Sequence, residues 1–259
     1  MKLRAKGVAY IDDLREVMTR DWKLIKPRLL YRSANLAKVP DGGQKLHDKF
    51  RIKYVIDLRT DDEVAAKPET LIPEIEYFHI PIADNAENPI VTKENRLAFL
   101  KELSAREGGT REYMRQFYPL LINSPKAIEG YKKIFNILLS AKKDEAVLFH
   151  CTQGKDRTGV VLLLILSALN VDNHVIIRKY MEYNIINWLF KASVRVAMSL
   201  FKSPRLASQL DNVISARRIY IKSAIYEIIN KYDGAENYLR NIIGISDNDI
   251  KLLRQKYLR

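Results

Sequence analysis

Ten residues around the only cysteine of this chain have the side chains best suited to chemistry. They read His150-Cys151-Thr152-Gln153-Gly154-Lys155-Asp156-Arg157-Thr158-Gly159. Arg157 follows Cys151 by six positions, and its planar guanidinium can bind two oxygens of one phosphate at once. A cysteine beside a helix N-terminus and a cation loses its proton more easily than a free cysteine does. The segment therefore predicts a thiolate nucleophile held against a bound oxyanion.

The remaining residues of this segment have supporting roles in the same interpretation. We expect His150 to orient the loop by hydrogen bonding and Thr158 to donate its hydroxyl toward the sulfur. Gly154 and Gly159 allow close approach of the backbone. Lys155 is open to two interpretations, a cation for a doubly phosphorylated or lipid substrate and a solvated loop lysine. The predicted phosphate-binding residues are Thr152, Gln153, Gly154, Lys155, Asp156 and Arg157.

Two apolar runs must position this segment. The run 146–149 has no alternation and ends at turn-forming residues, which predicts a short buried strand. The run that follows Gly159 is long enough for a helix that is buried on most sides. The residues between them form a strand-to-helix loop, where backbone amides and the positive end of the helix dipole favour an anion.

A nucleotide-binding P-loop and an inert cysteine both fit the segment poorly. The P-loop needs serine or threonine after its lysine and an earlier glycine, but Asp156 and Phe149 stand at these positions. A buried, inert cysteine is a common fate of a single thiol. An inert cysteine would not explain why an arginine and two glycines lie close to Cys151 in the sequence.

The segment resembles the signature of the cysteine-dependent protein tyrosine phosphatases. The pair Lys155-Asp156 is typical of the bacterial tyrosine and phosphoinositide phosphatases, which include secreted enzymes of Listeria and Mycobacterium. The resemblance continues upstream at 30–34 and at 55–60 with Glu63 following, and downstream at 238–246 and 252–254. The N-terminus departs from it, because the family has an Asn-Phe-Arg-Asp stretch where this chain has residues 10–15.

The resemblance implies a phosphomonoester hydrolase that forms a cysteinyl-phosphate intermediate and needs no cofactor. Its expected partners are phosphorylated proteins, with phosphoserine, phosphothreonine and phosphoinositides as further substrates. Two alternatives stay open, a phosphoinositide phosphatase as the main role and a catalytically inactive phosphate-binding module. The histidines outside the loop, at 47, 79 and 174, have no metal-ligand spacing, so no metal is predicted.

Two aspartates are candidates for the acid that protonates the leaving group. Asp156 is favoured because it lies on the loop itself, a position that the resemblance supports. Asp84 follows a predicted strand and is the alternative, although it also suits a turn or a cap. Asp57 and Arg59 end another predicted strand beside the site, and we interpret them as structural supports.

Length and composition agree with one α/β domain over residues 1–259. The chain is 47% hydrophobic and 29% charged, and no apolar stretch reaches the roughly 18 residues that a membrane span needs. The basic N-terminus is followed by no apolar signal core, so we expect a cytoplasmic protein or one whose leader lies outside this sequence. A single cysteine excludes an internal disulfide.

The expected architecture is a small central sheet surrounded by helices, with a helical, lid-like elaboration. Strands are predicted at 54–58 and 77–82, and helical insertions at about 85–125 and 185–210. Ser124 and Pro125 are predicted to begin a helix, and Ser246 with Asp249 to form a capping box. Further helices are predicted at 92–103 and 211–231.

The positive charge of the chain is unevenly distributed. The formal net charge is +13, and residues 178–222 contain nine basic side chains against two acidic ones. Apolar residues between Trp188 and Phe201 alternate with Lys191 and Arg195. We interpret this segment as a lid that attracts anionic substrates or contacts an anionic membrane, or as a core helix with a solvated basic face. The chain has no motif of a nucleic-acid-binding protein.

Overall fold

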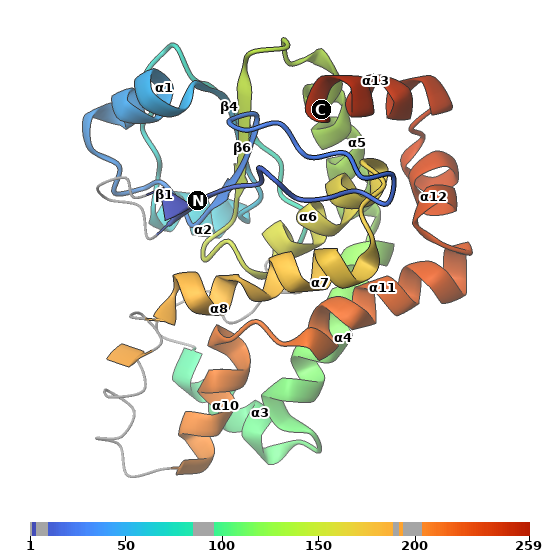
Figure 1. The fold of residues 1–259 in the computed structure, drawn as a ribbon. Helices are drawn as coiled ribbons and strands as arrows, with labels where there is room; N and C mark the ends of the chain where they lie inside the picture. Colours follow the sequence, from blue (N-terminus) through green and yellow to red (C-terminus); the bar gives the residue numbers. More distant parts are fainter. Residues whose placement is uncertain (1, 4–9, 85–95, 189–191, 194–203) are drawn as a thin grey trace.

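A mixed six-stranded sheet forms the centre of the described part of the chain (Figure 1). The computed structural model describes residues 2–3, 10–84, 96–188, 192–193 and 204–259. The strand order is β1-β2-β3-β6-β4-β5; β3, β6, β4 and β5 run parallel, and β1 and β2 pair antiparallel. The strands are β1 Lys2–Leu3, β2 Ile11–Asp13, β3 Leu30–Ser33, β4 Ile52–Asp57, β5 Glu76–His79 and β6 Ala146–His150.

Helices make up most of the remaining described structure. They are η1 Pro40–Gly43, α1 Gln44–Phe50, α2 Asp61–Ala66, α3 Arg96–Ala105, α4 Gly109–Asn123, α5 Pro125–Ser140, α6 Asp156–Ala168, α7 Asn173–Met181, α8 Tyr183–Ile186, α10 Pro204–Ile214, α11 Arg218–Tyr232, α12 Ala235–Asn237, η3 Tyr238–Ile243 and α13 Asp247–Tyr257. The predicted α/β fold, a small sheet surrounded by helices, is confirmed.

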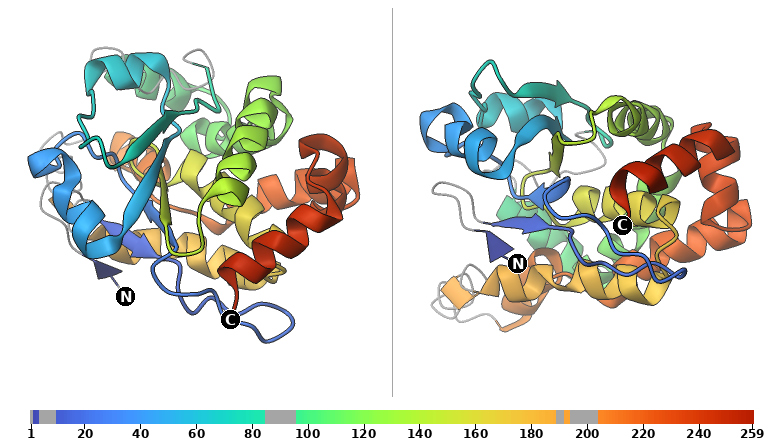
Figure 2. Two further views of the ribbon diagram at one scale, coloured as in Figure 1. Left: turned by 90° about the horizontal axis from the view of Figure 1, so that it is seen from above. Right: turned by 45° about the horizontal axis from the view of Figure 1, so that its top comes forward.

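Strand β6 is buried on both faces, and four of its five residues are apolar. Alternate side chains of β6 point to opposite faces, so Leu148 packs toward α1 while Val147 and Phe149 pack toward the other side. Figure 2 shows α1 on one side of the sheet and α5, α6 and α13 on the other. The strand predicted at 146–149 and the buried helix after it are confirmed as β6 and α6, and α6 lies in the larger core.

A group of helices extends from the sheet on the side of α6. Helix α4 contacts α3, α10 and α11, and α3 also contacts α10. In Figure 1, α3 and α10 lie beside each other at the end of this group that is farther from the sheet. Helices α3 and α4 lie within the predicted range 85–125, and α10 overlaps the end of the range 185–210; that these segments are insertions stays a prediction. Most of the segment 188–201, including Lys191 and Arg195, lies outside the described residues.

The prediction of one continuous helix at 211–231 is wrong. Helix α10 ends at Ile214 and α11 begins at Arg218. Between them the side chain of Asn184 binds Ala216 twice, accepting from its amide at 3.0 Å and donating to its carbonyl at 2.7 Å. These bonds replace the bonds that a continuous helix would make, so a tertiary contact ends a pattern that looks helical in the sequence.

The other predicted boundaries differ from the structure by a few residues. Strand β4 begins and ends earlier than predicted, and β5 ends at His79. The capping box of Ser246 and Asp249 is confirmed, whereas Ser124 stands at the N-cap of α5 without a side-chain bond to it. The helix predicted at 92–103 is described from Arg96 onward. Among the described residues, none of the helices is long and apolar enough to span a membrane.

Candidate active site

The predicted reactive loop follows β6 at the carboxyl edge of the parallel strands. In the register of the sheet, Ser33 of β3 and Asp57 of β4 both pair with His150, the last residue of β6. Cys151 begins the loop and is buried, and α6 begins at Asp156. Ligands of α/β sheets bind at this edge, and the first amides of α6 have no acceptor within the helix. The backbone thus presents hydrogen-bond donors beside the sulfur.

Two neighbouring segments hold the loop in place. The side-chain amide of Asn35 donates to the carbonyl of Thr152 at 2.8 Å, and the hydroxyl of Tyr10 donates to the carbonyl of Gly154 at 2.7 Å. Gly154 has a φ of +70°, and a Cβ there would lie 2.1 Å from the Tyr10 hydroxyl and 2.2 Å from the Ser33 carbonyl. Only glycine fits this position. Residues 10–15, which depart from the resemblance, therefore help to hold the loop through Tyr10.

Arg157 is fixed by a carboxylate from another part of the chain. Its guanidinium donates two hydrogen bonds to Glu63 of α2, one of them 2.8 Å long, and a third to the carbonyl of Leu58 at 3.3 Å. Glu63 also accepts from the Thr152 hydroxyl. Burial by itself raises the pKa of Glu63, but the bonds and charge of Arg157 outweigh it and lower that pKa to about 2. The pair therefore stays ionised at neutral pH, with the guanidinium oriented before substrate binds.

Asp156 and Lys155 are both held by the helical part of the molecule. The Tyr118 hydroxyl of α4 donates to Asp156 Oδ1 at 2.7 Å, and Lys155 Nζ lies 3.0 Å from the same oxygen. Lys155 is buried, and its ammonium donates to the carbonyl of Val213 at 2.5 Å and to that of Ser215 at 3.4 Å. In this conformation Lys155 binds the end of α10, and a contact with substrate stays a prediction.

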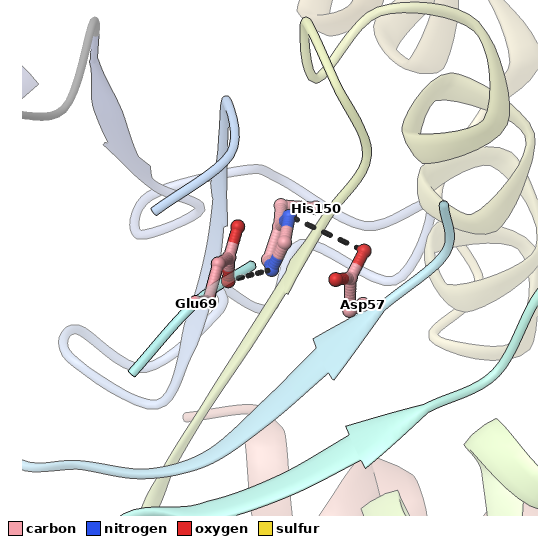
Figure 3. Close-up of side chains that lie close together, drawn as sticks. All are labelled: Asp57, Glu69 and His150. Atoms are coloured by element: carbon pink, nitrogen blue, oxygen red, sulfur yellow. Dashed lines mark ion pairs between the residues drawn. The ribbon is translucent and has the colours of Figure 1, made fainter. Parts of the chain in front are cut away.

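His150 lies between two buried carboxylates (Figure 3). Its Nε2 lies 3.2 Å from Glu69 and its Nδ1 lies 3.8 Å from Asp57. Burial lowers the pKa of His150, but the charges of Asp57 and Glu69 outweigh burial and raise it. The two neighbouring carboxylates thus favour the protonated form of the imidazole. This geometry agrees with the predicted role of His150 in orienting the loop.

The same cluster is the one group among the described residues whose atoms are close enough to ligate a metal. Its carboxylates already have strong partners. Arg59 donates to Asp57 at distances of 2.6 to 2.9 Å and lies 2.9 Å from Glu69, while the Tyr77 hydroxyl donates to Asp57 at 2.6 Å. The carboxylates of Asp57 and Glu69 therefore already have a guanidinium and a phenol as partners. Asp57 and Arg59 are placed beside the loop, as the sequence predicts.

The remaining predicted site residues lie in different settings. The Thr158 hydroxyl is buried and makes no hydrogen bond to any described residue, Cys151 included. Gln153 accepts a bond of 3.4 Å from the Tyr183 hydroxyl. Asp84 is exposed and pairs with Lys126. Cys151 and Asp156 are both close enough to Arg157 to raise its pKa by their charge, so the structure brings the predicted nucleophile, arginine and preferred acid together.

The sequence analysis did not predict the role of Glu63. It named this residue only as part of the family resemblance. A signal for it exists in the sequence, because Thr60 and Glu63 form the capping box of α2. The same carboxylate that accepts from the Thr60 amide also binds Arg157. Glu69, Tyr10 and Tyr118 were missed as well, and their separation from the loop in the sequence left no such signal.

The cluster around His150 makes a testable contribution to stability. Because the folded pKa of His150 is raised, its ion pairs stabilise the protein fully below about pH 6.5 and lose their effect as pH rises through the folded pKa. We expect His150→Gln to lower the free energy of unfolding at pH 6 by about 3–5 kcal/mol. Urea unfolding at pH 6 and pH 9 measures this, and the difference from wild type should shrink at pH 9.

The exposed His174 supplies the control for this measurement. His174→Gln removes a histidine without removing a buried ion pair, so its stability should follow wild type at both pH values. A difference between His150→Gln and wild type that is the same at pH 6 and pH 9 would show that the imidazole is not a buried cation.

The chain is similar to known phosphatases over most of its length. The chain matches the model of the tyrosine phosphatase family over residues 3–259. It is 26% identical to the triple specificity protein phosphatase PtpB of Mycobacterium tuberculosis, covering 89% of this chain and 91% of that protein. It is 32% identical to a putative tyrosine-protein phosphatase of Cupriavidus necator, covering 88% and 78%, and 26% identical to a tyrosine-protein phosphatase of Nostoc commune, covering 86% and 72%.

The family match defines an enzyme class, the hydrolases of phosphoric monoesters. Within that class the chain belongs to the tyrosine phosphatase family. It is a protein tyrosine phosphatase of bacterial type, and its partners are phosphorylated substrates.

Proposed function

We propose that the enzyme hydrolyses phosphotyrosine in proteins through a cysteinyl-phosphate intermediate. The Sγ of Cys151 attacks phosphorus, the S–P bond forms, and the bond from phosphorus to the leaving oxygen breaks while Asp156 gives that oxygen a proton. Water then attacks phosphorus, Asp156 takes its proton, and the S–P bond breaks to release phosphate. At the end of the cycle Asp156 is again protonated and the sulfur of Cys151 is again free.

The observation that carries this proposal is the fixed guanidinium of Arg157. Glu63 holds it in one orientation beside the loop amides, and Cys151 and Asp156 lie close to it. Donors that are oriented in advance stabilise the charge that develops on the equatorial phosphate oxygens without reorganising during the reaction. A phosphate-binding module without catalysis would have no use for the nucleophile and the acid at the same place.

Asp156 is the better candidate for the acid because the structure orients it. Tyr118 and Lys155 both hold its Oδ1, and its side chain is partly exposed beside the loop. Asp84 is more exposed and is paired with Lys126. A general acid must lie within hydrogen-bond reach of the leaving oxygen, and a residue on the phosphate loop meets this condition for any substrate that the loop binds.

Replacing the acid separates its chemical role from a structural one. We expect Asp156→Asn to lower kcat for phenyl phosphate about 100-fold, because phenolate is a poor leaving group that needs the proton. The loss for p-nitrophenyl phosphate, whose leaving group is stabilised, should stay below about tenfold. Steady-state kinetics on the two substrates measures the ratio. Equal losses on both would give Asp156 a structural role and return attention to Asp84.

We propose a substrate range that extends to phosphoserine, phosphothreonine and phosphoinositides. The similarity to a relative whose name includes triple specificity supports this range, as does the basic composition of residues 178–222. Comparing kcat/KM for a phosphotyrosine peptide and for mono-phosphorylated phosphoinositides tests it. A preference for the lipids above tenfold would make the phosphoinositide role the main one. Contact of the segment 188–201 with an anionic membrane stays a prediction.

A further inference from the structure

A buried tyrosine controls the surroundings of the proposed acid. Tyr118 of α4 is fully buried, and its hydroxyl lies 2.7 Å from Asp156 Oδ1. Its ring packs edge to face on Phe117 and Tyr180 and lies 5.9 Å from the ring of Tyr220. These rings fix the orientation of the phenol, so its hydroxyl is directed at the carboxyl group rather than free to turn away.

A second tyrosine extends this hydrogen bond into a chain. The hydroxyl of Tyr180, on α7, lies 2.6 Å from the hydroxyl of Tyr118. Each phenol has one proton to donate. Because Tyr118 donates to Asp156, its oxygen must accept from Tyr180, which makes the order Tyr180 to Tyr118 to Asp156. Burial and the charge of Asp156 raise the pKa of both tyrosines well above 10, so both keep these protons at neutral pH.

Oδ1 of Asp156 therefore faces a hydroxyl donor and an ammonium. Tyr118 donates to it, and the ammonium of Lys155 lies 3.0 Å away. A carboxyl oxygen that accepts a hydrogen bond and lies beside an ammonium is a poor place for the acidic proton. The acidic proton of the neutral carboxyl group accordingly has its place on Oδ2.

We propose that Tyr118 is a positioning residue, which occupies Oδ1 of Asp156 and directs the acidic proton onto Oδ2, from which it passes to the leaving oxygen. This proposal rests on the proposed function, in which Asp156 is the acid. It also gives the helical elaboration a task in the reaction. Helices α4 and α7 supply the two phenols, and the loop alone could not hold the carboxyl group in one orientation.

The variant Tyr118→Phe removes one hydroxyl and keeps the packing of the ring. We expect kcat for phenyl phosphate to fall about tenfold, the size of one hydrogen bond to a charged group. The KM should change less than twofold, since the phosphate loop is intact. For p-nitrophenyl phosphate, a substrate of nearly the same shape, kcat should fall less than twofold. A fall that is equal on both substrates would overturn the positioning role.

A double-mutant cycle gives the second criterion. In the Asp156→Asn background, adding Tyr118→Phe should cause no further loss on phenyl phosphate, because the positioned proton is already gone. A full additional tenfold loss would show that Tyr118 acts on something other than Asp156 and would overturn the proposal. If Asp156→Asn lowers kcat equally on both substrates, Asp156 is not the acid. The proposed role of Tyr118 is then wrong as well.

Two further variants guard against effects on folding. Tyr131→Phe is the matched control, because Tyr131 is also buried and donates its hydroxyl to α4, to the carbonyl of Leu121 at 2.7 Å. Its activity on both substrates should equal that of wild type. Should Tyr118→Phe unfold, Tyr180→Phe removes the donor behind it. For Tyr180→Phe we expect kcat to fall about threefold on phenyl phosphate and to stay unchanged on p-nitrophenyl phosphate. An equal fall of kcat on both substrates would contradict the order Tyr180 to Tyr118 to Asp156.

Discussion

Cys151→Ser is expected to abolish the hydrolysis of phenyl phosphate, with kcat falling by at least about 1,000-fold. A serine hydroxyl keeps its proton at neutral pH, and His150 cannot serve as its base because both nitrogens of the imidazole face carboxylates. Cys151 is buried and its replacement is nearly isosteric, so the protein should stay folded. Steady-state kinetics and thermal unfolding measure the two properties.

Binding of inorganic phosphate supplies the control for the serine variant. The loop amides and Arg157 remain, so the dissociation constant for phosphate should stay within about threefold of wild type. An activity within tenfold of wild type would contradict nucleophilic catalysis by Cys151. A wild-type protein that binds phosphate, shows no turnover and is insensitive to vanadate would instead be the inactive binding module.

Arg157→Lys should lower kcat/KM about 100- to 1,000-fold although it conserves the charge. An ammonium is a point charge with three donors that point in different directions, whereas the guanidinium binds Glu63 with one edge and keeps others for phosphate. The lysine variant cannot satisfy both partners at once. Initial rates on phenyl phosphate and titration with inorganic phosphate should both show the loss.

Glu63→Gln is the companion variant for Arg157→Lys. It removes the charge that fixes Arg157 but leaves the guanidinium present, so we expect a smaller loss of about tenfold in kcat/KM. If Arg157→Lys keeps kcat/KM within tenfold of wild type, the fixed guanidinium is not the group that stabilises the transferring phosphoryl group. The proposed cysteinyl-phosphate mechanism would then lose its main support.

The elements next to the loop were predictable because they are local in sequence. An apolar run of strand length, a turn-rich segment and an apolar run of helix length followed one another directly, and they are β6, the loop and α6. A buried strand or helix needs apolar neighbours but no particular partner residue, so its own sequence is enough to predict it. The helix predicted at 211–231 failed for the opposite reason, since Asn184 and Lys155 bind the backbone where α10 ends.

Lys155 shows how burial changes the meaning of a residue. In the sequence it is a basic side chain on a phosphate loop, which suits a substrate contact or a solvated cation. In the structure the helical elaboration covers it, and its ammonium binds the carbonyls of Val213 and Ser215 and the carboxyl group of Asp156. Neither interpretation anticipated a link between the loop and α10.

The sequence by itself determined the proposed chemistry of this protein, because the proposed nucleophile, arginine and proposed acid lie within seven consecutive residues of the chain. The tertiary structure alone decided what holds them. Glu63 is separated from Arg157 by 94 residues, Tyr118 from Asp156 by 38 and Tyr10 from Gly154 by 144. Hydrogen bonds over such separations leave no periodicity or spacing in the chain, since only packing of the sheet edge against the helices brings the partners together.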